Sequence, residues 1–159
     1  MAAPNRWIPS TLCYIESNHQ YLMMHRNKQD QDIHKGKWNG LGGKLLPGES
    51  PIDGVKREVL EESNLHIQTP QLRGILTFPH FKPGEDWLVF LYTCQDFLGD
   101  LSENHEGSLS WISKTEILDY PLWEGDRYFL KWLMDNRPFF TATFIYENKV
   151  LIDHQVSWQ

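Results

Sequence analysis

Cysteine, net basic charge and long apolar runs are all scarce in this sequence, and each shortage argues against a class of protein. The only two cysteines, Cys13 and Cys94, form no metal-binding or redox spacing, so we expect reduced thiols in the core. The formal net charge of −6 argues against a broad basic surface for a polynucleotide. A small phosphorylated ligand remains possible, because metal ions can supply the missing positive charge.

No apolar run approaches the length of a membrane-spanning helix, and residues 1–7 lack the basic stretch and apolar core of a signal peptide. We therefore expect a cytoplasmic protein with no membrane partner. The chain contains no repeat, low-complexity segment or linker, and its 40% hydrophobic and 23% charged residues are typical of a globular protein. Residues 1–159 are accordingly expected to form one domain.

The hydrophobic pattern predicts strands interspersed with two helices, not in regular alternation. The expected helices are residues 51–63 and 125–135, and the glycine-rich stretch 38–46 is expected to be an irregular strand that passes close to another segment. The expected strands are residues 11–16 and 21–26 (a hairpin around Ser17-Asn18), 71–81 and 86–94 (a pair around the turn 82–85), 109–113, and 139–146 with 150–154 (a closing hairpin). This order favours an α+β fold or a layered αβα sandwich.

The helix at residues 51–63 has clear signals at its start. Ser50 can cap it, Pro51 suits its first position, and Asp53 completes an approximate capping box. At about 100° per residue, three carboxylates fall within an arc of roughly 100°: Glu58, Glu61 and Glu62. They repel one another by a few tenths of a kcal/mol per pair. A structural helix gains nothing from this arrangement unless a cation offsets it, and Mg²⁺ prefers such oxygen ligands.

Taken alone, these carboxylates would favour a simpler interpretation, an exposed acidic face on which Arg57 pairs with Glu61. The upstream residues reverse that preference. From Gly43 to Leu65 the sequence fits G-x5-E-x7-R-E-U-x-E-E-x-G-U, in which U is aliphatic, with Glu49 at the first glutamate. Six such fixed positions match by chance on the order of once in 10⁷ starts. The chain thus resembles the Nudix hydrolases.

The resemblance implies a Nudix-type αβα sandwich, with a mixed sheet flanked by helices, and a Mg²⁺ cofactor for which Mn²⁺ can substitute. It implies that Arg57 holds the carboxylates, that Glu49 braces the loop, and that the helix glutamates bind metal and polarise the attacking water. The implied metal ligands are Glu58, Glu61, Glu62, the Gly42 carbonyl, and Glu106 with Glu103 as the alternate. Asn64 departs from the pattern, which has glycine there, and asparagine is the next most tolerant residue for a left-handed helix end.

Outside this motif, the segments 38–44 (WNGLGGK) and 122–126 (LWEGD) resemble the MutT-like branch, which sanitises oxidised purine nucleoside triphosphates. In that branch an asparagine at the position equivalent to Asn39 hydrogen-bonds the purine edge, and a tryptophan at the position equivalent to Trp123 stacks on the base. Two acidic residues follow there, but here the positions are Gly125 and Asp126, so only the second is retained. The implied substrate-binding residues are Asn39, Trp123, Asp126, Trp87 and Lys44. Each has a simpler alternative: a turn residue for Asn39, a core residue for a tryptophan, and a solvated lysine for Lys44.

We therefore expect Mg²⁺-dependent hydrolysis of a purine nucleoside triphosphate such as 8-oxo-dGTP to the monophosphate and pyrophosphate. One alternative keeps the chemistry but acts on guanosine tetra- or pentaphosphate, or on canonical triphosphates. Another is a nucleotide sensor without catalysis, which the intact Arg57, Glu58, Glu61 and Glu62 argue against. RNA decapping is disfavoured because no basic track is apparent. The sequence leaves the oligomeric state open.

Overall fold

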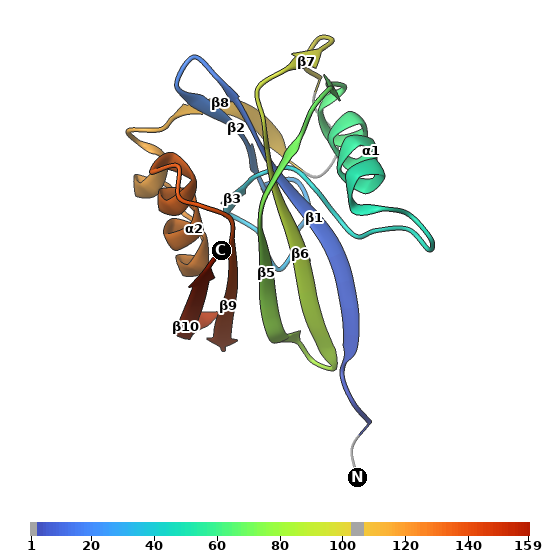
Figure 1. Cartoon of the computed structure of the whole chain (residues 1–159), viewed down its shortest axis with the longest axis vertical. Coiled ribbons are helices and arrows are strands. Elements are labelled where there is room, and N and C mark those ends of the chain that lie inside the picture. Colours follow the sequence, from blue (N-terminus) through green and yellow to red (C-terminus); the bar gives the residue numbers. More distant parts are fainter. Residues whose placement is uncertain (1–2, 103–106) are drawn as a thin grey trace.

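The computed structural model describes residues 3–102 and 107–159, and a mixed sheet of eight strands runs through its centre (Figure 1). The strand order is β10-β9-β5-β6-β1-β2-β3, and β8 pairs with β2 outside this path. The pairs β1–β6 and β5–β9 are parallel, and the others are antiparallel. The strands of this sheet are β1 (Arg6–Ser17), β2 (Gln20–His25), β3 (Trp38–Asn39), β5 (Gln71–Lys82), β6 (Glu85–Cys94), β8 (Ser108–Ser113), β9 (Phe140–Glu147) and β10 (Val150–Trp158).

Two helices lie on opposite sides of this sheet: α1 (Pro51–Ser63) and α2 (Glu124–Met134). A 3-10 turn, η1 (Ile117–Asp119), precedes α2, and a separate two-stranded ribbon pairs β4 (His66–Ile67) with β7 (Phe97–Leu98). In the described part of the chain, no helix is long and apolar enough to cross a membrane. This arrangement confirms the predicted αβα sandwich.

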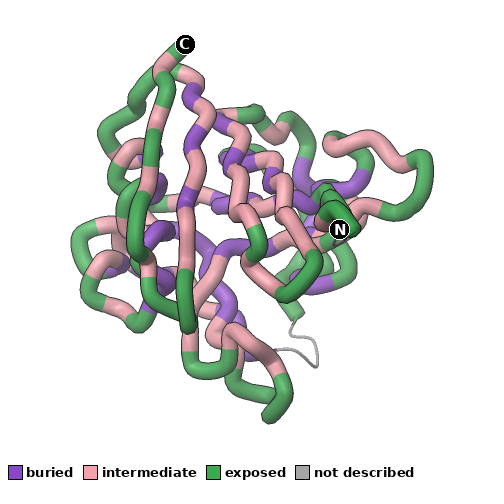
Figure 2. Tube along the Cα trace, turned by 90° about the horizontal axis from the view of Figure 1, so that it is seen from below, coloured by how far each residue is buried: buried purple, intermediate pink, exposed green. Residues whose placement is uncertain are grey.

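Alternation along β1 explains why both faces of the sheet are covered. Tyr14 belongs to the core cluster that contains Phe129 of α2, whereas its neighbours Cys13 and Ile15 belong to the cluster that contains Val55 of α1. Successive side chains of a strand point to opposite faces, so one strand contributes to two hydrophobic layers. Figure 2 shows the result: buried stretches run through the middle of the molecule, and exposed stretches follow its outer loops.

Helix α1 begins and ends as its sequence predicts. The Ser50 hydroxyl accepts a hydrogen bond from the Asp53 amide at 3.2 Å, and Pro51 occupies the first position. At the other end Asn64 has φ 66°, in the left-handed region, and its amide donates to the Leu60 carbonyl at 2.9 Å. The cap therefore orients the helix that carries the motif glutamates.

The predicted hairpin at residues 11–26 is present, but its ladder is short: β1 and β2 pair antiparallel over two residue pairs only. Strand β1 begins earlier, at Arg6, and pairs in parallel with β6 from Arg6 to Ile15, leaving only Glu16 and Ser17 to pair with β2. The turn itself is shifted by one residue, to Asn18 and His19 with φ values of 52° and 61°. Pairing of β1 with a strand far away in sequence therefore limits the hairpin to the end next to the turn.

The glycine-rich stretch 38–46 forms less strand than predicted. Only Trp38–Asn39 is regular, and isolated bridges then join Leu41 to Cys13 and Lys44 to Ser10. The expected close approach is present, and its partner is β1: a side chain at Gly42 would overlap the Thr11 carbonyl. The segment therefore lies directly against β1 and leads into the loop before α1.

Candidate active site

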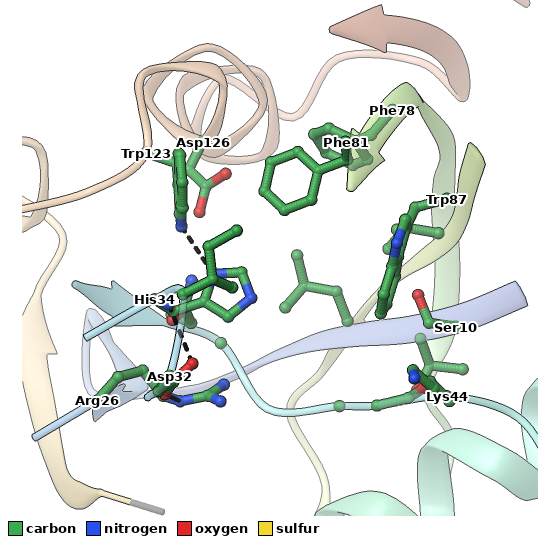
Figure 3. A pocket seen from close by; sticks show the side chains of 18 of the residues that line it. Ser10, Arg26, Asp32, His34, Lys44, Phe78, Phe81, Trp87, Trp123 and Asp126 are labelled. Carbon is green, nitrogen blue, oxygen red and sulfur yellow. Dashed lines mark hydrogen bonds and ion pairs between the residues drawn. The ribbon is translucent and has the colours of Figure 1, made fainter. Parts of the chain in front are cut away.

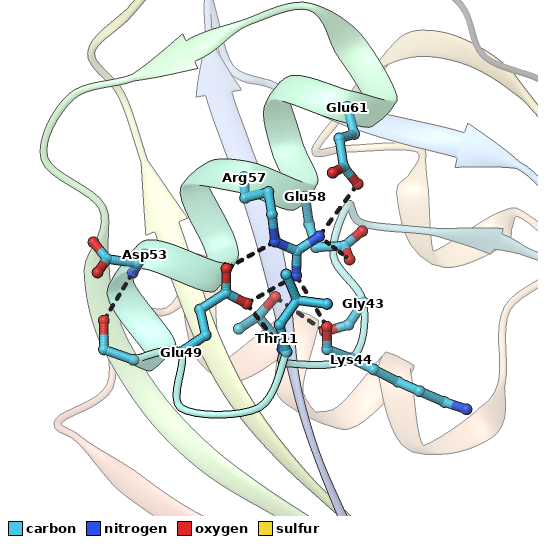
Figure 4. Close-up of polar contacts among 10 residues, drawn as sticks. Thr11, Gly43, Lys44, Glu49, Asp53, Arg57, Glu58 and Glu61 are labelled. Atoms are coloured by element: carbon cyan, nitrogen blue, oxygen red, sulfur yellow. Dashed lines mark hydrogen bonds and ion pairs between the residues drawn. The ribbon is translucent and has the colours of Figure 1, made fainter.

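Arg57 is the centre of a charged cluster between α1 and the glycine-rich segment (Figure 4). Its guanidinium donates two hydrogen bonds to Glu49, at 2.8 and 2.9 Å, and further bonds to Glu58 at 2.8 Å and Glu61 at 3.2 Å. It also donates to the Lys44 carbonyl at 3.1 Å. The hydrogen bonds from Arg57, with another from the Leu46 amide, lower the pKa of Glu49 to about 2. One guanidinium thus ties the helix glutamates to the loop.

The remaining motif carboxylate faces the other way. Glu62 is 7% exposed, and its Oε1 accepts a hydrogen bond from the Gly42 amide at 2.7 Å. Gly43 lies beneath Glu58, because a Cβ added to Gly43 would stand 2.6 Å from the Glu58 carboxyl carbon. Both glycines therefore let the backbone come close to carboxylates, which a larger residue would push away.

The donor atoms of this cluster suit a hard divalent cation, since they are carboxylate and carbonyl oxygens. In the described residues, however, no three His, Cys, Asp or Glu side chains stand close enough to hold a metal. Glu58 and Glu61 converge on Arg57, while Glu62 faces the Gly42 amide. The chemistry of these donors, carboxylate oxygens beside the Gly42 backbone, nevertheless suits a hard divalent cation. The proposed fifth ligand, Glu106, and its alternate Glu103 lie outside the described residues.

A cavity of about 520 Å³ opens beside this cluster, between β1, β6, α2 and the loop after β2 (Figure 3). That volume is within the range of small-molecule sites, roughly 300–1,000 Å³. Of the three motif glutamates on α1, Glu58 lines the cavity. Its walls also include all five positions predicted to bind substrate, together with Gly42: Asn39, Lys44, Trp87, Trp123 and Asp126. The structure thus places these predicted residues around one space, whereas Arg57, Glu61 and Glu62 stand behind it.

Two residues that line this cavity, Asn39 and Asp126, carry buried side-chain oxygens. The Oδ1 atom of Asn39 is buried and accepts no hydrogen bond from any described residue. Asp126 is 6% exposed, and burial raises the pKa of its carboxyl to about 8, although Lys37 and Arg127 oppose the shift. At pH 7 this carboxyl is mainly protonated and can donate a hydrogen bond. The cavity therefore contains an unused acceptor and a neutral acid.

The two tryptophans stand on opposite walls of the cavity (Figure 3). Trp123 is only 5% exposed, because Phe81 and Tyr146 pack against it at centroid distances of 5.2 and 5.3 Å and the Lys37 amine lies 5.2 Å from its ring. Trp87 is more open, and Lys44 and Lys82 lie over it at 5.5 and 5.4 Å. Base stacking on Trp123 stays a prediction, since little of its ring is accessible.

Several lining residues escaped the sequence analysis. Phe78 and Phe81 both face the cavity although three positions separate them, because the β5–β6 register shifts between Phe78 and Lys82. Tyr146, from β9, accepts a hydrogen bond from the Gly125 amide at 2.7 Å. A Cβ on Gly125 would stand 2.8 Å from that hydroxyl, which explains why no acidic residue fits there. The loop after β2 adds a further group: Gln31, Asp32, Ile33 and His34.

Comparison with known proteins agrees with this geometry. An uncharacterized Nudix hydrolase, YvcI, from Bacillus subtilis is 31% identical, covering 86% of this chain and 85% of its own. A mouse protein named oxidized purine nucleoside triphosphate hydrolase is 34% identical, covering 65% of this chain and 67% of its own. The crystal structure of the mutator MutT protein from Bacillus halodurans superposes with a TM-score of 0.83 at 27% identity, covering 94% of this chain and 97% of that one. The NUDIX domain model matches residues 7–133, and the chain therefore belongs to the Nudix hydrolases, enzymes that act on nucleoside diphosphate linkages.

Proposed function

We propose that this enzyme hydrolyses an oxidised purine nucleoside triphosphate, such as 8-oxo-dGTP, to the monophosphate and pyrophosphate in the presence of Mg²⁺. The reaction consumes one water: the oxygen bridge between the α- and β-phosphates is broken, one of these two phosphorus atoms gains a bond to the water oxygen, and the other keeps the bridging oxygen. The name of the mouse relative, which specifies oxidised purines, supports this substrate class.

The observation that carries the proposal is the pairing of Asn39 and Asp126 inside the cavity. The unpartnered Oδ1 of Asn39 is an acceptor, and the neutral Asp126 carboxyl is a donor as well as an acceptor. An 8-oxopurine carries an N–H at position 7 and a carbonyl at position 8. Guanine has instead an acceptor nitrogen at position 7 and a C–H at position 8. A ligand that satisfies these buried groups avoids a loss of about 1–3 kcal/mol per unpaired group.

The opposite end of the cavity suits phosphates. Lys44 and Lys82 bring two positive charges to the Trp87 wall, and Glu58 lines the cavity beside them. Mg²⁺, held by Glu58, Glu61, Glu62 and the Gly42 carbonyl, would supply positive charge to the phosphate oxygens. Arg57 fixes the orientation of Glu58 and Glu61, and the Gly42 amide fixes that of Glu62. Such fixed orientation is what lets charged groups act without reorganising during the reaction.

A nucleotide panel tests the proposal. Purified enzyme with Mg²⁺ is given 8-oxo-dGTP, dGTP, dATP, CTP and guanosine tetraphosphate, and products are separated by chromatography. We expect 8-oxo-dGTP to be converted most efficiently, with monophosphate and pyrophosphate as products. Faster turnover of guanosine tetraphosphate or CTP would transfer the substrate assignment to that nucleotide.

A substitution tests the chemistry separately. Glu62→Gln preserves shape and removes a charge, so we expect kcat to fall by at least ~10²-fold with an unchanged circular dichroism spectrum. Glu116→Gln, on an exposed glutamate beside η1, is the matched control and should retain wild-type turnover. Near wild-type kcat in Glu62→Gln would refute the role of this carboxylate.

A further inference from the structure

The loop between β2 and β3 lines the cavity and is held in shape by its own polar contacts. Arg26 donates its backbone amide to the Lys37 carbonyl at 2.9 Å and accepts from Gly36 at 2.7 Å. Its side chain bonds the largely buried Asp32 carboxylate at 2.6 Å. The other oxygen of Asp32 accepts the His34 amide at 3.0 Å. These contacts determine where the His34 ring stands.

The His34 ring is itself fixed by two aromatic neighbours. The Trp123 indole N–H donates to His34 Nδ1 at 2.8 Å, and the two rings are nearly perpendicular, at 82°. The Phe81 ring lies almost parallel to it, with centroids 6.2 Å apart. Figure 3 shows the ring extending from the loop into the cavity, between Trp123 and the Trp87 wall. Contacts from a loop, a helix end and strand β5 thus hold one imidazole.

The contact with Trp123 decides which ring nitrogen of His34 carries the proton. An indole nitrogen can only donate, so Nδ1 must accept, and the neutral ring then carries its hydrogen on Nε2. Burial lowers the pKa of His34 to about 4; Arg26 and Lys82 add to this shift, and Asp32 opposes it. The ring is therefore neutral at pH 7. His34 accordingly offers one N–H donor at Nε2.

We propose that His34 is a specificity-determining residue whose Nε2–H donates a hydrogen bond to an acceptor atom on the nucleotide base. The inference rests on the proposed function, because it concerns the base bound in the same cavity. With Asn39 Oδ1 as acceptor and His34 Nε2–H as donor, the cavity favours a base that presents an N–H to Asn39 and a carbonyl or ring-nitrogen acceptor to His34 in one orientation. His34 does not touch the charged cluster around Arg57, so it acts on binding and not on bond cleavage.

Equilibrium binding tests this role without depending on turnover. Calorimetry measures the Kd of 8-oxo-dGMP and of deoxyribose 5-phosphate, which has no base, for the wild type, His34→Phe and His34→Gln. His34→Phe keeps a ring against Phe81 but has neither donor nor acceptor. We expect this variant to weaken the binding of 8-oxo-dGMP by about tenfold to a hundredfold and to leave the Kd of deoxyribose 5-phosphate unchanged. Gln can accept from the indole and also donate, so His34→Gln should stay within about fivefold of the wild type.

The outcomes separate the possibilities. Unchanged 8-oxo-dGMP affinity in His34→Phe, equal weakening of both ligands, or absence of 8-oxo-dGMP binding to the wild type would overturn the proposal. His66→Phe, at the exposed position of strand β4, controls for the general effect of replacing a histidine. Should His34→Phe not fold, the imidazole N–H signal of the wild type serves instead, and it must shift with 8-oxo-dGMP but not with deoxyribose 5-phosphate. Failure of 8-oxo-dGTP hydrolysis alone would overturn the proposed function and leave the binding result standing.

Discussion

Asp126→Asn should make the protein more stable at neutral pH, because it removes a carboxyl that the fold keeps protonated. Burial raises the pKa of Asp126 to about 8, from the ordinary aspartate value of 3.8. The folded chain keeps this proton between pH 4 and 7, whereas the unfolded chain releases it, so the free energy of unfolding falls as the pH rises. Each pH unit lowers the free energy of unfolding by up to about 1.4 kcal/mol, or by about 4 kcal/mol over this interval. The position of Asp126 in the first turn of α2 favours the anion by up to ~2 kcal/mol, which leaves an expected difference of about 2–4 kcal/mol at pH 7.

Urea unfolding, followed by circular dichroism between pH 4 and 8, measures this difference directly. Wild type and Asp126→Asn should have the same free energy of unfolding at pH 4 within ~0.5 kcal/mol. Above pH 4 the variant should become steadily more stable than the wild type. Subtracting the two curves cancels the other titrating groups. Asp119→Asn, at an exposed aspartate, is the control and should follow the wild type. A difference between wild type and Asp126→Asn that does not vary with pH would show that Asp126 is ionised in the folded protein, and would remove the neutral acid from the cavity.

The other predictions concern the cap, the Tyr146 contact, the cation and the pH profile. Asn64→Gly should change stability by less than ~0.5 kcal/mol in urea unfolding, because relief of the left-handed strain offsets the lost hydrogen bond to the Asp100 carbonyl. Gly125→Ala should destabilise by about 1–3 kcal/mol, and Tyr146→Phe in the same chain should restore part of the loss in thermal melts. Excess chelator should abolish turnover, and Mg²⁺ or Mn²⁺ should restore it; full activity in chelator would contradict the cation requirement. In steady-state kinetics kcat should rise toward alkaline pH, while KM for 8-oxo-dGTP rises above pH ~8 as Asp126 ionises.

The parts of the fold that were predictable from sequence are those determined by local chemistry. The capping bond of Ser50 and the positive φ of Asn64 depend only on neighbours within one helix, so α1 was placed with both ends correct. The hairpin at residues 11–26 is shorter than predicted because most of β1 pairs with β6, more than seventy residues later. Local patterns report strand propensity, and the choice between two possible partners depends on tertiary packing.

The same division applies to the site. The motif spacing pointed to Glu58, and the resemblance of segment 38–44 to the MutT-like branch pointed to Asn39, since both patterns are properties of the sequence itself. Phe81 was missed because a shift in strand register turns it toward the cavity, and His34 because only the folded loop brings it to the Trp123 indole.

The most direct test of the central claim is the ratio of kcat/KM for 8-oxo-dGTP to that for dGTP, measured with Mg²⁺ for the wild type, Asn39→Ala and Asp126→Ala. We expect the wild type to prefer 8-oxo-dGTP by about tenfold or more, since discrimination by one buried hydrogen-bonding group is worth ~1–3 kcal/mol. Each alanine variant should raise KM for 8-oxo-dGTP more than it lowers kcat, and should reduce the ratio. A wild type without purine preference, or two variants that keep the native ratio, would contradict the assignment of the cavity to an oxidised purine.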